Sequence, residues 1–134
     1  MSKGMYSFER FVKSRWSLVI IAHNRIIFRS QASAVKPLVR YLRERHPDGE
    51  PVVIYDKYVG RAAALLMVLI KPLKVYTPLL SLGGKEVFGE FGIPFQAQRE
   101  VKYLMGFASD QMCQWEKLTA GKTPEEFWKL LHDI

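Results

Sequence analysis

Hydrophobic residues recur at two spacings along the chain, and the two spacings predict helices that alternate with strands. Apolar residues at helical spacing predict helices over residues 6–14, 34–45, 59–70, 81–91, 110–118 and from 123 onward. Short β-branched or apolar runs predict strands over residues 17–22, 25–28, 51–55, 74–77 and 95–101. Strands separated by helices favour a mainly parallel sheet covered on both faces. The pattern therefore predicts an α/β fold, a three-layer α/β/α domain over residues 1–134.

Two local signals sharpen this picture. The runs SLVIIA and RIIF flank the pair His23-Asn24, a polar two-residue turn typical of a β-hairpin. The hairpin adds an antiparallel strand, so the predicted sheet has five strands and is mixed. Near the C-terminus, Thr123, Pro124 and Glu126 have the order of a capping box that starts the last helix.

Composition is that of a soluble globular protein, with 49% apolar and 25% charged residues among 134. Cys113 is the sole cysteine, which excludes an internal disulfide and an all-thiolate metal site within one chain. The longest apolar run, Ala62 to Ile70, ends at Lys71-Pro72 and is too short to span a membrane. No signal peptide is visible, so we expect a cytoplasmic protein without a membrane partner.

The net charge of +7 is concentrated in the first third of the chain. Residues 1–45 hold ten Lys/Arg against two acids, whereas residues 46–134 hold ten against eleven. Within this basic third, Lys36, Arg40 and Arg43 recur at helical spacing opposite an apolar face. Such a stripe is typical of a solvated helix, and it is also the alternative nucleic-acid-binding surface of the basic helix Lys36–Arg45. Only Tyr41 interleaves an aromatic ring with these charges.

Several stretches resemble a small uncharacterised prokaryotic family, a domain of unknown function with a cytidine deaminase-like fold. They are SLVIIAHNRIIFRS at 17–30, KPL at 36–38, VVIYDKYVGRAAALL at 52–66, FGIPFQ at 91–96 and MCQWEK at 112–117. The resemblance runs over nearly the whole chain and implies a mixed five-stranded sheet in the deaminase-like arrangement. Because deaminase-like domains commonly associate through sheet-covering helices, it also implies a homodimer as an option.

Deaminases of this fold hold zinc with an H/C-x-E motif and a P-C-x-x-C motif at two helix N-termini. Here Val59-Gly60-Arg61 occupies the first position and has neither a ligand nor a catalytic glutamate. In the second, Cys113 stays but Glu116 replaces the other cysteine. We therefore expect no metal, no cofactor and no zinc-dependent deamination.

The resemblance places the N-termini of the 59–70 and 110–118 helices together at the carboxyl ends of the strands. Helix N-termini favour anions, so a small phosphate-bearing or nucleotide-like ligand suits this place. Its expected binding residues are Asp56, Lys57, Gly60 and Arg61. The structural alternative is that Asp56 caps the helix, Gly60 allows close packing, and both cations are solvated.

Cys113 lies in the first turn of its predicted helix, where the helix dipole lowers a thiol pKa. Glu116 follows on the same helical face and could act as its acid–base. This pair makes a Cys113-dependent enzyme acting on a nucleotide-like substrate the catalytic alternative. Conversely, a lone cysteine is often a small buried hydrophobe, and Glu116 could pair with Lys117. The sequence leaves open whether the protein is an enzyme.

Overall fold

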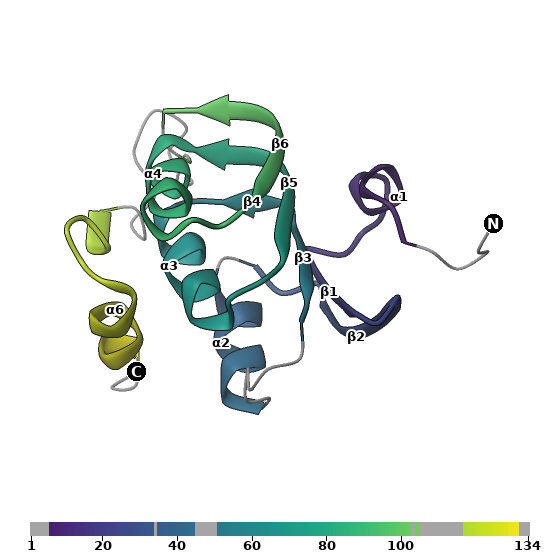
Figure 1. Cartoon of the computed structure of the whole chain (residues 1–134), viewed down its shortest axis with the longest axis horizontal. Helices are drawn as coiled ribbons and strands as arrows, with labels where there is room; N and C mark the ends of the chain where they lie inside the picture. Colours follow the sequence, from purple (N-terminus) through teal and green to yellow (C-terminus); the bar gives the residue numbers. More distant parts are fainter. Residues whose placement is uncertain (1–5, 34, 45–50, 103, 105–116, 132–134) are drawn as a thin grey trace.

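The computed structural model describes residues 6–33, 35–44, 51–102, 104 and 117–131. Helices and strands alternate along this chain as predicted, and the structure is α/β (Figure 1). The elements are α1 (Phe8–Val12), β1 (Leu18–Ala22), β2 (Arg25–Ser30), α2 (Lys36–Glu44), β3 (Val53–Asp56), β4 (Tyr58–Val59), α3 (Arg61–Ile70), β5 (Lys74–Ser81), α4 (Leu82–Phe91), β6 (Phe95–Val101) and α6 (Pro124–Leu131). The helix expected over residues 110–118 lies almost entirely outside the described residues.

The strands form one mixed, open sheet. Its order is β2-β1-β3-β5-β4, and β6 pairs with β5. The β1–β2 and β1–β3 pairs are antiparallel, whereas β3, β4 and β6 all run parallel to β5. The predicted mixed sheet is therefore confirmed, with a parallel half that places several strand ends at one edge.

Strands β3 and β4 form one interrupted strand. Each of their paired residues matches a β5 residue 21 positions later, as Val53 does with Lys74 and Val59 with Leu80. Only Lys57 separates the two strands. Counted in this way, the sheet has the five strands that the sequence predicts.

The interruption lies opposite Pro78, which has no backbone N–H to give to a neighbouring strand. Beside it, the Thr77 hydroxyl accepts the Leu79 N–H at 3.2 Å and donates to the Leu79 carbonyl at 3.0 Å. These bonds satisfy backbone groups within β5 and let the strand continue to Ser81. The sequence prediction ended this strand at Thr77 and was wrong, because β5 continues past Pro78 to Ser81.

The break also changes which way the side chains point. Strict alternation would direct Ile54 and Val59 to opposite faces of the sheet. Both side chains lie instead in the same core cluster and are fully buried. The irregularity at Asp56 and Lys57 therefore re-aims the end of the strand, as β-bulges do next to functional sites.

The predicted hairpin is confirmed. His23 and Asn24 both have positive φ angles, 52° and 62°, as a type I′ turn requires of its two central residues. The capping box is confirmed as well. The Thr123 N–H donates to Glu126 Oε1 at 2.9 Å, and the Glu126 N–H donates to Thr123 Oγ1 at 3.1 Å.

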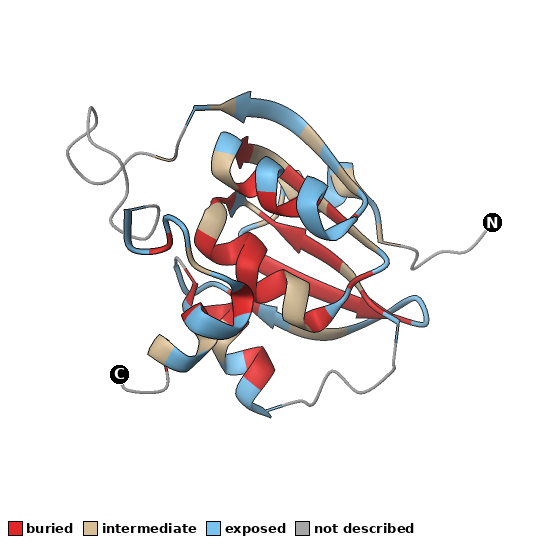
Figure 2. Ribbon diagram, turned by 60° about the vertical axis from the view of Figure 1, so that its left-hand side comes forward, coloured by how far each residue is buried: buried red, intermediate tan, exposed pale blue. Residues whose placement is uncertain are grey.

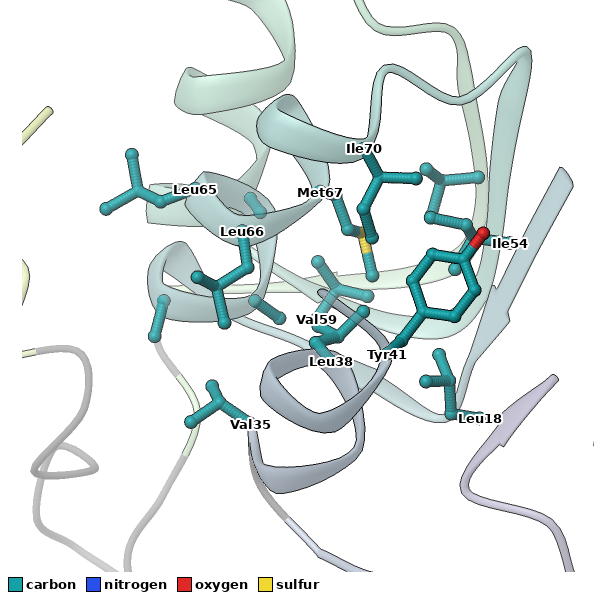
Figure 3. Close-up of a cluster of buried hydrophobic side chains, with 14 of the residues drawn as sticks. Leu18, Val35, Leu38, Tyr41, Ile54, Val59, Leu65, Leu66, Met67 and Ile70 are labelled. Atoms are coloured by element: carbon teal, nitrogen blue, oxygen red, sulfur yellow. The ribbon is translucent and has the colours of Figure 1, made fainter. Parts of the chain in front are cut away.

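The main core lies between the sheet and helices α2, α3 and α4, with α6 packed on the outer side of α3 (Figure 1). Buried residues concentrate in α3 and the central strands (Figure 2). Leu66 and Met67 of α3 lie among the side chains of Val59, Leu38 and Ile54 (Figure 3). Helix α3 is central, as its unbroken apolar sequence predicts.

The opposite face of the sheet is covered, among the described residues, by α1 alone (Figure 1). Phe11 is fully buried there and packs against Tyr55, with ring centroids 5.6 Å apart. Tyr55 in turn stacks on Tyr76 at 4.9 Å. Helices thus lie on both faces of the sheet, but very unequally.

Helix boundaries differ from the sequence prediction where tertiary contacts decide them. Helix α3 begins at Arg61 and not at residue 59, because Tyr58 and Val59 pair with β5. Helix α1 is shorter than the predicted 6–14, α2 begins at Lys36 after a turn at Val35, and Ser81 is the N-cap of α4. The predicted stop of α4 at Gly92 is confirmed by a φ of 68° at its C-cap.

Candidate functional site

The carboxyl edge of the parallel strands holds the start of two long helices. Helix α3 follows β4, and α4 follows β5. A Cβ atom on Gly84 of α4 would lie 3.2 Å from the carbonyl oxygens of both Gly60 and Val59. The N-termini of α3 and α4 therefore touch. The resemblance implied convergence of α3 with the 110–118 helix, and Gly84 was not among the expected site residues, although the Gly83-Gly84 pair is a sequence signal of close backbone approach.

Asp56 ends β3 and is buried, with 7% of its surface exposed. It pairs across the sheet with Leu18, a residue of the main core, so its carboxyl lies on the α3 side. Burial raises the pKa of Asp56 from 3.8 to about 8, although the Tyr58 and Lys57 backbone N–H groups oppose this by favouring the carboxylate. At neutral pH this carboxyl is mainly protonated.

Gly60 is the N-cap of α3, with an extended backbone (φ −105°, ψ −171°). It offers no side-chain oxygen to the first turn of the helix, and no acidic residue lies in that turn. The positive end of the helix dipole is therefore not balanced by a carboxylate of the first turn. Such an end favours an anion.

Arg61 is the first residue of α3 and is partly buried. Its Nε donates to the Thr119 carbonyl oxygen at 3.0 Å. Thr119 itself has no exposed surface. This bond brings the segment that follows Glu116 to the N-terminus of α3. Cys113 and Glu116 themselves lie outside the described residues.

Lys57 extends toward the α1 side of the sheet, away from the α3 side on which Asp56 lies. Its Nζ donates to the Ser14 carbonyl oxygen at 2.6 Å and lies 4.9 Å from the centre of the Phe11 ring. Burial lowers the pKa of this amine. Asp56 thus ends β3 on the α3 side of the sheet, Gly60 and Arg61 begin α3, and the Lys57 amine lies with α1.

The basic stripe of α2 is exposed, as predicted. Two of its three cations already contact protein groups: Arg40 Nε lies 2.9 Å from Glu44 Oε2, and an Arg43 guanidinium nitrogen donates to the Leu131 carbonyl at 3.2 Å. Lys36 is the third. The stripe offers charge to a partner, but part of that charge is engaged within the chain.

Within the described part of the chain, no three His, Cys, Asp or Glu side chains lie close enough to hold a metal ion. The same part contains no helix of the length and hydrophobicity needed to cross a bilayer.

Fold and site together define an α/β protein with a mixed sheet and two helix N-termini at its parallel-strand edge. The chain belongs to the family described as a domain of unknown function, DUF1893 (TM1506), whose model matches residues 8–134. It is similar to the crystal structure of a DUF1893 family protein, TM1506, from Thermotoga maritima. That match has 29% sequence identity and a TM-score of 0.84, and covers 93% of this chain and 84% of the other. Comparison with curated proteins gives no match.

Proposed function

We propose that the chain is a binding module for a small phosphate-bearing, nucleotide-like ligand held at the start of α3. The observation that carries this proposal is a helix N-terminus that has no capping side chain and follows shortly after the buried Asp56 carboxyl in the chain. An ionised carboxylate at that place would itself act as the anion of the helix end. When the Asp56 carboxyl is neutral, the positive N-terminal end of α3 can instead be balanced by an anionic ligand.

A phosphate would accept hydrogen bonds from backbone N–H groups of the first turn of α3, which point out of the helix. Arg61 adds positive charge at the same end. Gly60 has no side chain to stand between the backbone and the ligand. These three features support the phosphate part of the proposal.

Asp56 supports the nucleotide-like part. A protonated carboxyl can donate one hydrogen bond and accept others, which suits a base edge or a sugar hydroxyl. At pH 7 it also adds no negative charge that would repel the phosphate. We include the cytidine deaminase-like arrangement in the proposal, supported by the leading antiparallel hairpin and the parallel strands that follow it.

Native mass spectrometry of protein purified gently from its host tests the proposal. We expect an additional mass of a phosphate-bearing compound that is lost on denaturation. Cys113→Ala separates binding from the catalytic alternative. A retained ligand that survives this substitution indicates binding, whereas loss of turnover or of a thiol adduct would indicate a Cys113 nucleophile with Glu116 as its acid–base.

The pH dependence of ligand affinity gives a second test. Between pH 7 and pH 9 a phosphate monoester stays dianionic, so its own charge hardly changes. Asp56 ionises in this interval, and we expect the affinity for a nucleoside monophosphate to fall. Asp56→Asn, which cannot ionise, should keep its affinity across the interval. An equal fall in both proteins would contradict a role for Asp56.

The exposed α2 stripe keeps nucleic-acid binding through Lys36, Arg40 and Arg43 as a second candidate. That function predicts an affinity that falls steeply with salt and is weakened by Arg40→Ala. A homodimer through the sheet-covering helices is also proposed, and sedimentation at micromolar concentration tests it.

A further inference from the structure

The α1 side of the sheet carries a row of cations over aromatic rings. Arg29 lies 4.4 Å from the Trp16 ring, Lys57 4.9 Å from Phe11, Lys74 5.0 Å from Tyr76, and Arg10 5.4 Å from Tyr6. The members of these four pairs lie in α1 and the residues on either side of it, in strands β2 and β5, and at Lys57 between β3 and β4. We call this surface the α1-side face.

The charge of this region is strongly one-sided. Residues 6–30, which form α1 and the β1–β2 hairpin, contain five Lys/Arg and one acid, Glu9. Arg10, Lys13 and Arg15 are exposed. The excess charge of the first third is therefore shared between α2 and the α1-side face, on opposite sides of the sheet. The sequence pattern showed the stripe on α2 and missed this second surface, because its members come from different elements.

An exposed aromatic ring extends this face toward the carboxyl edge. Tyr58 is 65% exposed. Its neighbour Val59 lies in the main core, so alternation along β4 directs Tyr58 to the α1 side. Trp16, half-buried under the Arg29 guanidinium, is a second ring near the surface.

We propose that the α1-side face binds single-stranded nucleic acid, with phosphates on Arg10, Arg29 and Lys74 and a base on Tyr58. A positively charged surface that also presents an exposed aromatic ring combines the features that bind single strands with little sequence preference. Charge complementarity selects this occupant over a second copy of the chain. A symmetric dimer through this face would bring the same cations against each other.

Fluorescence anisotropy with a labelled 20-nucleotide oligo(dT), over a range of salt concentrations, tests this proposal. Arg29→Ala/Lys74→Ala removes two charges from the α1-side face, and Lys117→Ala/Lys129→Ala, at two exposed lysines outside both candidate surfaces, is the matched control. We expect the first pair to lower the slope of log affinity against log salt by about 1.4, at about 0.7 per lost phosphate contact. The Lys117/Lys129 pair should leave the slope unchanged.

Tyr58→Ala provides a readout that depends on stacking and not on charge. We expect it to weaken binding at least about fivefold with an unchanged salt slope. Leu73→Ala, at another exposed apolar residue, is the matched control and should have no effect. Thermal melts confirm that each variant folds, and Arg10→Ala/Arg15→Ala replaces the first pair if it does not.

Three results would overturn the proposal. The first is an absence of oligonucleotide binding at low salt, and the second is an equal decrease in the salt slope for both double variants. The third is binding to anionic phospholipid vesicles without binding to oligo(dT).

Discussion

Asp56→Asn replaces a buried, titrating carboxyl by a neutral group of nearly the same shape. In the folded protein the pKa of Asp56 is raised from 3.8 to about 8 by burial. The folded state therefore holds this proton more tightly than the unfolded chain does. Its contribution to stability is fully present below pH 3.8 and is lost as the pH rises toward 8.

The size of the effect follows from the change in proton affinity. At about 1.4 kcal/mol for each tenfold change in proton affinity, moving the pKa from 3.8 to about 8 corresponds to on the order of 6 kcal/mol. That is a large share of the stability of a typical small domain. Asparagine cannot ionise, so the variant should not lose this stability as the pH rises.

Urea denaturation of both proteins at several pH values between 4 and 8.5 measures the effect. We expect the free energy of unfolding of Asp56→Asn, minus that of the unmodified protein, to rise by up to about 1.4 kcal/mol per pH unit across this range. Glu90→Gln, at an exposed carboxyl, is the control and should give a flat difference. If the Asp56→Asn difference is also flat, Asp56 is not a buried neutral carboxyl and the reasoning fails.

Three further predictions concern packing, capping and metal. Gly84→Ala should destabilise the fold by about 1–3 kcal/mol, because its Cβ would lie 2.9 Å from Leu80 Cδ1. The new Cβ of Gly89→Ala would meet nothing within 4 Å, so this variant should stabilise α4 by up to about 1 kcal/mol, and chemical denaturation compares the two variants. Thr123→Ala should lower the melting temperature by about 3 °C through loss of the capping box, and an unchanged value would contradict its role. Elemental analysis should find less than one zinc per chain, and the protein should deaminate neither cytidine nor adenosine; one equivalent of zinc with chelator-sensitive activity would refute this.

Local sequence signals predicted the features that local physics decides. The His23-Asn24 turn needs two residues that tolerate positive φ, and the Thr123 capping box lies within four consecutive residues. Helix α3 is apolar on nearly every side, which marks it as central without knowledge of its partners. In these cases the residues of one short segment determine its structure, so the sequence of that segment was enough to predict it.

Long-range pairing decided what the sequence could not predict. The predicted strand ended at Thr77, yet β5 continues past Pro78, and the neighbouring strand is interrupted opposite that residue. Val59 looked like the start of a helix, and pairing with Leu80 makes it a strand residue instead. Neither outcome follows from the residues next to the one concerned.

The same limit applies to the candidate site. Asp56 and Lys57 are adjacent in sequence and were predicted to share one site, but the Lys57 amine reaches Ser14 on the other side of the sheet. Gly84 joins the start of α3 from a helix more than twenty residues later. The direction of the Lys57 side chain depends on the register of the sheet, and the position of Gly84 depends on the packing of α3 against α4.

The most direct test of the phosphate site is an amide NMR titration of the ¹⁵N-labelled protein with a nucleoside monophosphate at pH 7. A phosphate at the start of α3 predicts that the largest shifts occur at the amides of Gly60, Arg61 and Ala62, and that Arg61→Ala reduces them. Arg40→Ala, which removes the same charge from α2, should leave them unchanged. The proposal is contradicted if millimolar ligand shifts none of these amides, or if the shifts lie only on α2 or the α1-side face.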